Sequence, residues 1–96
     1  MPEQLTAEHF LPHMDKVFRV KGGAHALTLV QVDIPPLPPS VGQRRPFTLI
    51  FRGPPGNVLR EGLYTMEVDA GPAFDLYIIP VYTPARDRQD YQAVFN

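Results

Sequence analysis

Two histidines near the start of the chain have the spacing of metal ligands. His9 and His13 stand four residues apart, which puts two imidazoles on one helix face, and Glu8 and Asp15 could add oxygen ligands. Pro12 lies between the histidines and should end a helix there, so the two rings need not converge. We therefore expect surface or capping histidines and no metal site.

Two carboxylates could supply general acid–base chemistry. Glu67 and Asp75 fall on outward positions of adjacent predicted strands, on a diagonal of about 7 Å, a separation that catalytic carboxylates use. Such pairs are common on solvated sheet faces, and catalysis would also need a cleft. The sequence has no cysteine, and its single serine, Ser40, lies in no nucleophile or phosphate-binding motif. We expect no catalytic residue and no cofactor.

Arginines provide the candidate binding residues. Arg44, Arg45 and Arg52 could form a basic spot beside an exposed tyrosine such as Tyr77 or Tyr82, an arrangement that small barrels use for single-stranded nucleic acid. Nine Lys+Arg against ten Asp+Glu give a net charge of −1, however, which disfavours nucleic acid and anionic membranes as partners. We expect a solvated charged edge instead, with Arg52 bonding loop carbonyls at the turn that follows it.

A proline-rich segment is the preferred contact with another protein. Residues 35–46 read Pro-Pro-Leu-Pro-Pro-Ser-Val-Gly-Gln-Arg-Arg-Pro and are predicted to form an exposed polyproline-type loop. A leucine on a pre-ordered loop loses little conformational entropy when it docks. The predicted partner-binding residues are Pro36, Leu37, Pro38, Arg44, Arg45 and Arg52.

The proline content decides the fold class. The chain has 12 prolines in 96 residues, and they leave no uninterrupted stretch after residue 12 for a good helix. We predict a single all-β domain over residues 1–96, a small six-stranded antiparallel barrel or sandwich. A short helix over residues 5–12 should lay Phe10 and Leu11 over an open end of it. The strands are expected at residues 16–21, 24–34, 47–52, 62–69, 74–80 and 91–95.

A first hairpin sets the register at the start of the sheet. A two-residue turn at Gly22–Gly23 pairs Phe18 with Leu27 and puts the apolar residues of both strands on one face. His25 then lies near the hairpin tip, and we expect it to be partly buried and bonded to a backbone carbonyl. After Leu29 the apolar residues change parity, which predicts a β-bulge or a strand buried on both faces.

A second hairpin sets the register of the fourth and fifth strands. A three-residue turn with Gly71 in the left-handed conformation places Met66 opposite Phe74. Strand five has apolar residues on both faces, including Tyr77. We expect the N-terminal helix to cover its outer face; the alternative is an exposed patch that meets another chain. Pro80 gives strand five an edge-type signature, through which copies of the chain could associate.

Five segments together resemble a known family. They are LTAEHF at 5–10, PFTLIFRGP at 46–54, EGLY at 61–64, IPV at 79–81 and YQAVFN at 91–96. As the ensemble FRGP, GLY, IPV and YxAVFN, they resemble a small bacterial family of single-domain proteins of unknown function. The resemblance implies no activity. It does imply a structural or assembly role linked to phage-tail-like structures, because such proteins are associated with neighbourhoods that encode tail-collar-like or tail-fibre-like proteins.

These observations favour a non-enzymatic protein-interaction or assembly module. The alternative is a small-ligand-binding barrel with a cavity lined by Tyr64, Met66, Phe74 and Phe51. The expected partner is another protein or a second copy of the chain, and neither nucleic acid nor a membrane. The first twenty residues lack the basic-then-apolar pattern of a signal peptide, and no apolar run approaches about 18 residues, so we expect a cytoplasmic location.

Overall fold

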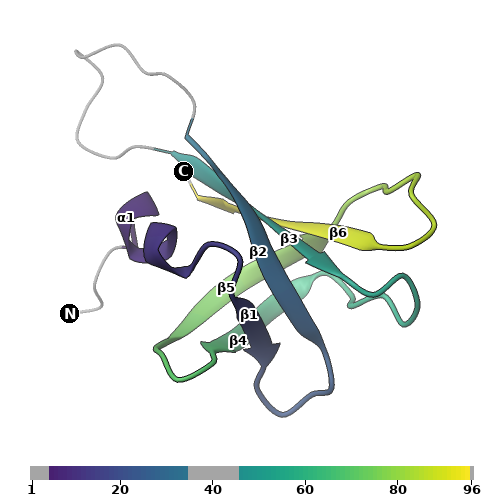
Figure 1. Ribbon diagram of the computed structural model, residues 1–96, viewed down its shortest axis with the longest axis horizontal. Helices are drawn as coiled ribbons and strands as arrows, with labels where there is room; N and C mark the ends of the chain where they lie inside the picture. Colours follow the sequence, from purple (N-terminus) through teal and green to yellow (C-terminus); the bar gives the residue numbers. More distant parts are fainter. Residues whose placement is uncertain (1–4, 35–45, 96) are drawn as a thin grey trace.

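Six antiparallel strands close into a barrel, one of the two arrangements that the sequence predicted, with one short helix at the N-terminal side (Figure 1). The computed structural model describes residues 5–34 and 46–95. The order of strands around the barrel is β1-β2-β3-β6-β5-β4. The elements are α1 (Ala7–Phe10), the 3-10 turn η1 (Leu11–His13), β1 (Val17–Val20), β2 (Ala26–Asp33), β3 (Phe47–Gly53), β4 (Gly62–Val68), β5 (Ala73–Pro80) and β6 (Gln89–Phe95).

The β1–β2 hairpin has the predicted register. Phe18 is the Cα partner of Leu27, and the amide of Val20 donates to the carbonyl of His25 over 3.0 Å. Gly22 takes a φ of +78°, which glycine adopts without the steric cost that a Cβ would add. The predicted pairing is therefore confirmed. Strand β1 ends at Val20, however, so Lys21 and Ala24, which flank the predicted two-residue turn, lie outside the strands.

The predicted change of parity in the second strand is a β-bulge. Leu29 is the partner of Phe51, and the next pair joins Gln31 to Ile50, so Val30 is the extra residue on β2. The bulge returns the apolar side chain of Val32 to the inside of the barrel, where it packs against the core. Strand β2 thus changes parity without being buried on both faces.

The β4–β5 hairpin confirms one prediction and corrects another. Met66 pairs with Phe74, as expected. The left-handed residue of the turn is Ala70, with a φ of +57°, and not Gly71. The amide of Gly71 instead donates to the carbonyl of Val68, and a Cβ on Gly71 would lie 3.3 Å from the Cβ of Val68. A glycine is therefore favoured at position 71 because a side chain there would crowd Val68, and not because the backbone takes an unusual angle.

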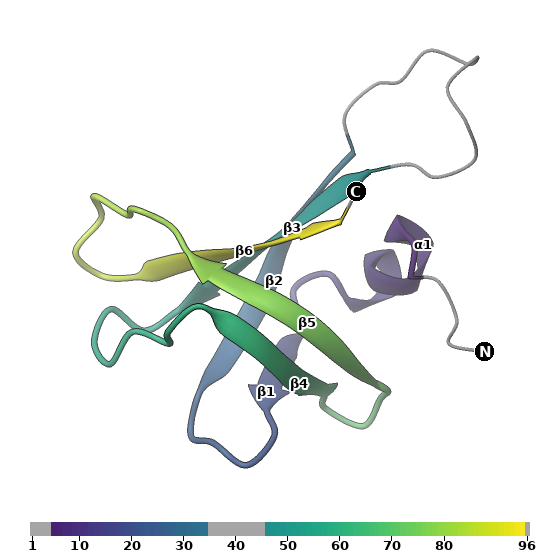
Figure 2. The same cartoon turned by 180° about the vertical axis from the view of Figure 1, so that it is seen from behind.

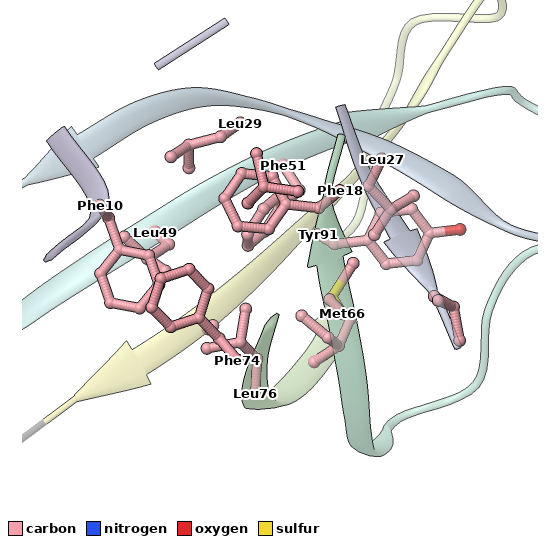
Figure 3. Packing of buried hydrophobic residues seen from close by; sticks show 14 of the residues in the cluster. Phe10, Phe18, Leu27, Leu29, Leu49, Phe51, Met66, Phe74, Leu76 and Tyr91 are labelled. Atoms are coloured by element: carbon pink, nitrogen blue, oxygen red, sulfur yellow. The ribbon is translucent and has the colours of Figure 1, made fainter. Parts of the chain in front are cut away.

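Side chains of the inward-facing residues fill the barrel (Figure 3). Phe51, Met66 and Phe74, which would line the cavity of a ligand-binding barrel, pack within this buried cluster, and Tyr64 lies at its margin. The largest fully buried side chains are Phe10, Phe18, Leu27, Leu29, Leu49, Phe51, Met66, Leu76, Ile78 and Tyr91.

Helix α1 plugs the end of the barrel where β5 and β6 separate. These strands pair only at Ile79–Gln92 and Pro80–Tyr91, and beyond those pairs they diverge, with α1 beside the opening (Figure 2). Phe10 fills the opening: it is 0% exposed, and its ring centroid lies 4.6 Å from that of Phe74, 5.8 Å from Phe95 and 5.9 Å from Phe47. The expectation that the helix covers an open end is therefore confirmed for Phe10, whereas Leu11 is exposed.

Candidate interaction surface

Apolar side chains also occupy outward positions on the barrel, across the neighbouring strands β4, β5, β6 and β3. Leu63 is the partner of Tyr77. Two residues further along β5, Ile79 pairs with Gln92, which in turn pairs with Ile50 on β3. Leu63 is 69% exposed and Tyr77 48% exposed. We call the following residues the outer patch: Leu63, Tyr77, Ile79, Ile50 and Val94.

The predicted cover of this face by the N-terminal helix is wrong. Ala7 and Phe10, the buried residues of α1, belong to the core cluster at the plugged end of the barrel. A helix of four residues that is anchored there leaves the outward side chain of Tyr77 half exposed. Among the described residues, the outer patch is therefore the exposed alternative that the sequence left open.

Three carboxylates lie around the outer patch: Glu67 and Asp75 near the start of β5, and Glu61 near its end, next to Gly62, the partner of Ile78. The hydroxyl of Tyr77 donates to Oε2 of Glu61 over 2.7 Å, and the hydroxyl of Thr65 donates to Oδ1 of Asp75 over 2.6 Å. The register confirms that Glu67 and Asp75 lie diagonally on adjacent strands. Within the described part of the chain, no lysine or arginine forms an ion pair with these carboxylates, although Arg19 lies directly opposite Glu67 on β1.

The hydrogen bond to Glu61 raises the pKa of the Tyr77 phenol above its ordinary value, and partial desolvation and the negative charge of Glu61 act in the same direction. Tyr77 is therefore held as a neutral hydrogen-bond donor whose hydroxyl is fixed by the carboxylate. The ring is left facing solvent beside Leu63, which makes an ordered apolar platform.

Arginines gather near the C-terminal end of β5, where the β5–β6 connection projects from the barrel (Figure 1). Arg52 and Arg88 each place Nε 3.4 Å from Oδ1 of Asp90, so two guanidinium groups share one carboxylate. The predicted bond from Arg52 to loop carbonyls is wrong, because β6 brings Asp90 directly opposite Arg52. Tyr82 is 92% exposed in the same connection, and Arg86 is exposed there too. We call Arg52, Tyr82, Arg86 and Arg88 the arginine end.

Of the six partner-binding residues predicted from the sequence, Arg52 alone belongs to the part of the chain that the structure describes. The outer patch was not among those predictions, although a signal for it existed. Placing Tyr64 and Met66 inward on strand four requires Leu63 to point outward, where a leucine has no role in the core. The residues outside the described ranges are Pro36, Leu37, Pro38, Arg44 and Arg45.

The histidines have structural roles. The amide of Thr6 donates to Nδ1 of His9 over 2.9 Å, which caps α1, and the ring of His13 packs edge-on against Phe18 and Phe74. Nε2 of His25 donates to the carbonyl of Asn57 over 2.7 Å, as predicted. Among residues 5–34 and 46–95, no group of three or more His, Cys, Asp or Glu side chains could hold a metal ion.

A small pocket of about 170 Å³ lies between the β1–β2 turn and the β3–β4 connection, lined by residues that include His25, Asn57 and Tyr91. Its polar groups already have partners: His25 bonds Asn57, and the hydroxyl of Tyr91 accepts a hydrogen bond from the amide of Leu59 over 3.0 Å. Ligand pockets typically have volumes of about 300–1,000 Å³. These contacts therefore act to anchor the β3–β4 connection to the barrel.

None of the helices that the structure describes is long and apolar enough to cross a membrane. No curated protein and no solved structure matches the chain significantly. A family model matches residues 5–95, which covers every strand of the barrel and the helix that plugs it, so the chain belongs to the family described as a domain of unknown function (DUF6916).

Proposed function

We propose that this protein is a non-enzymatic interaction or assembly module that binds another protein through the outer patch. The observation that carries the proposal is the exposure of Leu63 at 69% beside Tyr77 at 48%, on strands whose opposite face is the packed core. Exposed apolar side chains on neighbouring strands, with charged side chains around them, are characteristic of a protein interface. Tyrosine and arginine, both present at this surface, are the side chains enriched at the energetic centres of interfaces.

The rigidity of the barrel supports this role. Leu63 and Tyr77 lie on hydrogen-bonded strands, and the Tyr77 hydroxyl is fixed by Glu61, so binding orders few new degrees of freedom. Full burial of a leucine side chain contributes about 1.5–3 kcal/mol, which makes Leu63 a suitable anchor. The interior is occupied by the protein's own side chains, which also favours binding at the surface over binding inside the barrel.

Within this proposal, the partner belongs to a phage-tail-like structure, an assignment that rests on the family resemblance alone. The contact residues that the sequence predicts between 36 and 45 stay a prediction, and Arg52 would contribute a charge near the edge of the same surface. No catalytic step is proposed for any residue.

The test is an affinity purification of the tagged protein from its native host, with mass spectrometry of the proteins that co-purify. We expect one dominant partner at near-stoichiometric amounts, and we expect Leu63→Asp to abolish its capture because a buried unpaired carboxylate is costly. Leu11→Asp is the matched control, since Leu11 is also an exposed leucine but lies at the plugged end of the barrel. Capture of the partner by Leu63→Asp at the wild-type level would refute this use of the outer patch.

A further inference from the structure

Strand β5 has one backbone edge that is only partly paired. On one side it pairs with β4 along Ala73–Ile78, whereas on the other side it pairs with β6 at Ile79 and Pro80 alone. Continued pairing would place Tyr77 opposite Val94, but the two strands diverge there (Figure 2). Among residues 5–34 and 46–95, β5 therefore has no strand beside it on the β6 side before Ile79.

The hydrogen bonds at the two ends of β5 show which residues face this gap. The amide of Val68 donates to the carbonyl of Pro72 over 3.0 Å, and the amide of Val81 donates to the carbonyl of Asp90 over 3.1 Å. In antiparallel pairing, residues that bond to one neighbouring strand alternate with residues that face away from it. Even-numbered residues of β5 therefore bond to β4, and odd-numbered residues turn their N–H and C=O groups toward the β6 side. We call the odd-numbered residues that face the gap the free edge: Ala73, Asp75 and Tyr77.

The plug leaves the free edge open. Its three residues are exposed. Phe10 fills the opening with its ring, and the chain after the plug is tied to β2, where the amide of Asp15 donates to the carbonyl of Leu29 over 2.7 Å. No backbone hydrogen bond joins α1 to β5 within the described ranges. A row of unpaired N–H and C=O groups on a strand is a template for pairing with another extended chain.

We propose that the free edge binds an extended segment of a partner protein, which adds to the barrel wall as a strand beside β5. In this mode of recognition, main-chain hydrogen bonds supply affinity and alternate side chains supply specificity. The inference rests on the proposed function and states which kind of partner the outer patch meets, since Tyr77 belongs to both surfaces. The added strand would also lie between Tyr77 and Val94, which are 48% and 45% exposed on either side of the gap.

Charge favours a segment of another protein over a second copy of this chain. Two free edges related by a two-fold axis would pair about their middle residue, Asp75, and would place the carboxylates of the two copies opposite each other. Like charges that are directly opposite destabilise a pair of strands. We therefore expect the bound segment to carry a lysine or arginine beside Asp75 and an apolar residue beside Tyr77.

The first experiment selects phage-displayed random peptides on the purified wild-type protein. We expect enriched peptides with apolar residues at every second position. Each should bind Asp75→Pro at least about tenfold more weakly than Asp75→Ala, because both variants lose the carboxylate and only proline also lacks the amide. Proline is tolerated on an edge strand where its nitrogen faces solvent, and circular dichroism checks that both variants fold. Equal binding to the two variants, or the absence of any enriched peptide, overturns the proposal.

Hydrogen exchange of the wild type supplies a measurement that does not depend on the variants. In the free protein, the amides of Asp75 and Tyr77 should exchange much faster than those of Leu76 and Ile78, which bond to β4. Binding of an enriched peptide should slow the exchange of the Asp75 and Tyr77 amides at least about tenfold. Unchanged exchange of both amides in the peptide complex overturns strand addition.

The two proposals can fail separately. A partner whose binding is lost in Leu63→Asp, but is equal for Asp75→Pro and Asp75→Ala, refutes strand addition and leaves the interaction module in place. A partner that binds Leu63→Asp like the wild type, but is lost in Asp75→Pro alone, supports strand addition and refutes the use of Leu63. Loss of binding in both Leu63→Asp and Asp75→Pro, with binding to Asp75→Ala retained, supports both proposals.

Discussion

The substitution Phe10→Ala removes the side chain that closes the barrel. The Phe10 ring is completely buried and lies within 6 Å, centroid to centroid, of three other phenylalanine rings. Replacement of a buried phenylalanine by alanine costs about 3–5 kcal/mol, through lost transfer free energy and the cavity that remains. Part of that cavity can collapse, because α1 is a four-residue helix at the barrel end. We therefore expect a loss of about 3–4 kcal/mol in the free energy of unfolding.

The loss is large for a domain of this size. Unfolding free energies of small domains are about 5–15 kcal/mol, and each kcal/mol shifts the thermal midpoint by about 4–8 °C, so the midpoint should fall by roughly 12–30 °C. Urea unfolding measures the loss in the free energy of unfolding. It can be followed by circular dichroism and by tyrosine fluorescence, since the chain has no tryptophan. Leu11→Ala is the control: this neighbouring side chain is 44% exposed and should cost less than about 1 kcal/mol. A loss below about 1 kcal/mol for Phe10→Ala would refute the plug as a source of stability.

Three further substitutions test particular contacts. Gly53→Ala would put a methyl group 2.6 Å from a buried leucine methyl of β2 and should cost about 1–3 kcal/mol, whereas Gly56→Ala enters open space and should leave the thermal midpoint nearly unchanged. Tyr91→Phe removes the acceptor of a buried amide and should cost about 1–3 kcal/mol in urea unfolding. Glu61→Gln should lower the pKa of Tyr77, which ultraviolet titration against Tyr77→Phe detects. Because this pKa is raised on folding, the stability gained is complete below the unfolded tyrosine value of about 10 and is lost as the pH rises through the folded pKa.

Local patterns were sufficient to predict the hairpins. The pairing of Phe18 with Leu27 and of Met66 with Phe74 follows from turn position and from the alternation of apolar residues, because a shift by one residue would expose every core side chain. The bulge after Leu29 follows from the same rule, since a change of parity requires one extra residue. These features depend on residues that are close together in the sequence.

Contacts between distant segments could not be predicted in the same way. The pairing of β1 with β4 closes the barrel, and no local pattern distinguishes it from the open edges of a sandwich. Arg52 meets Asp90, 38 residues away, because β3 and β6 are neighbours in the closed barrel. Reasoning from the neighbouring turn alone assigned it to loop carbonyls.

The position of the helix explains why an exposed patch on strand five was only the alternative expectation. The alternation predicted that Tyr77 points outward, but it did not predict whether α1 would cover it. The apolar side chains of a short helix can be buried either over a sheet face or in a gap, and the divergence of β5 from β6 provides a gap that Phe10 fills. The outer face then receives no cover from α1.

Folding does not require the outer patch to be apolar. The inward residues and Phe10 fill the interior, so the side chain of Leu63 adds little to the core and a polar residue there would cost little stability. An exposed leucine beside an ordered tyrosine is instead a liability for solubility unless another surface covers it. The inward side chains of these strands form the core, whereas the outward ones do not contribute to it. Leu63→Asp should therefore separate folding from association: the thermal midpoint should stay close to that of the wild type while association through this surface is lost.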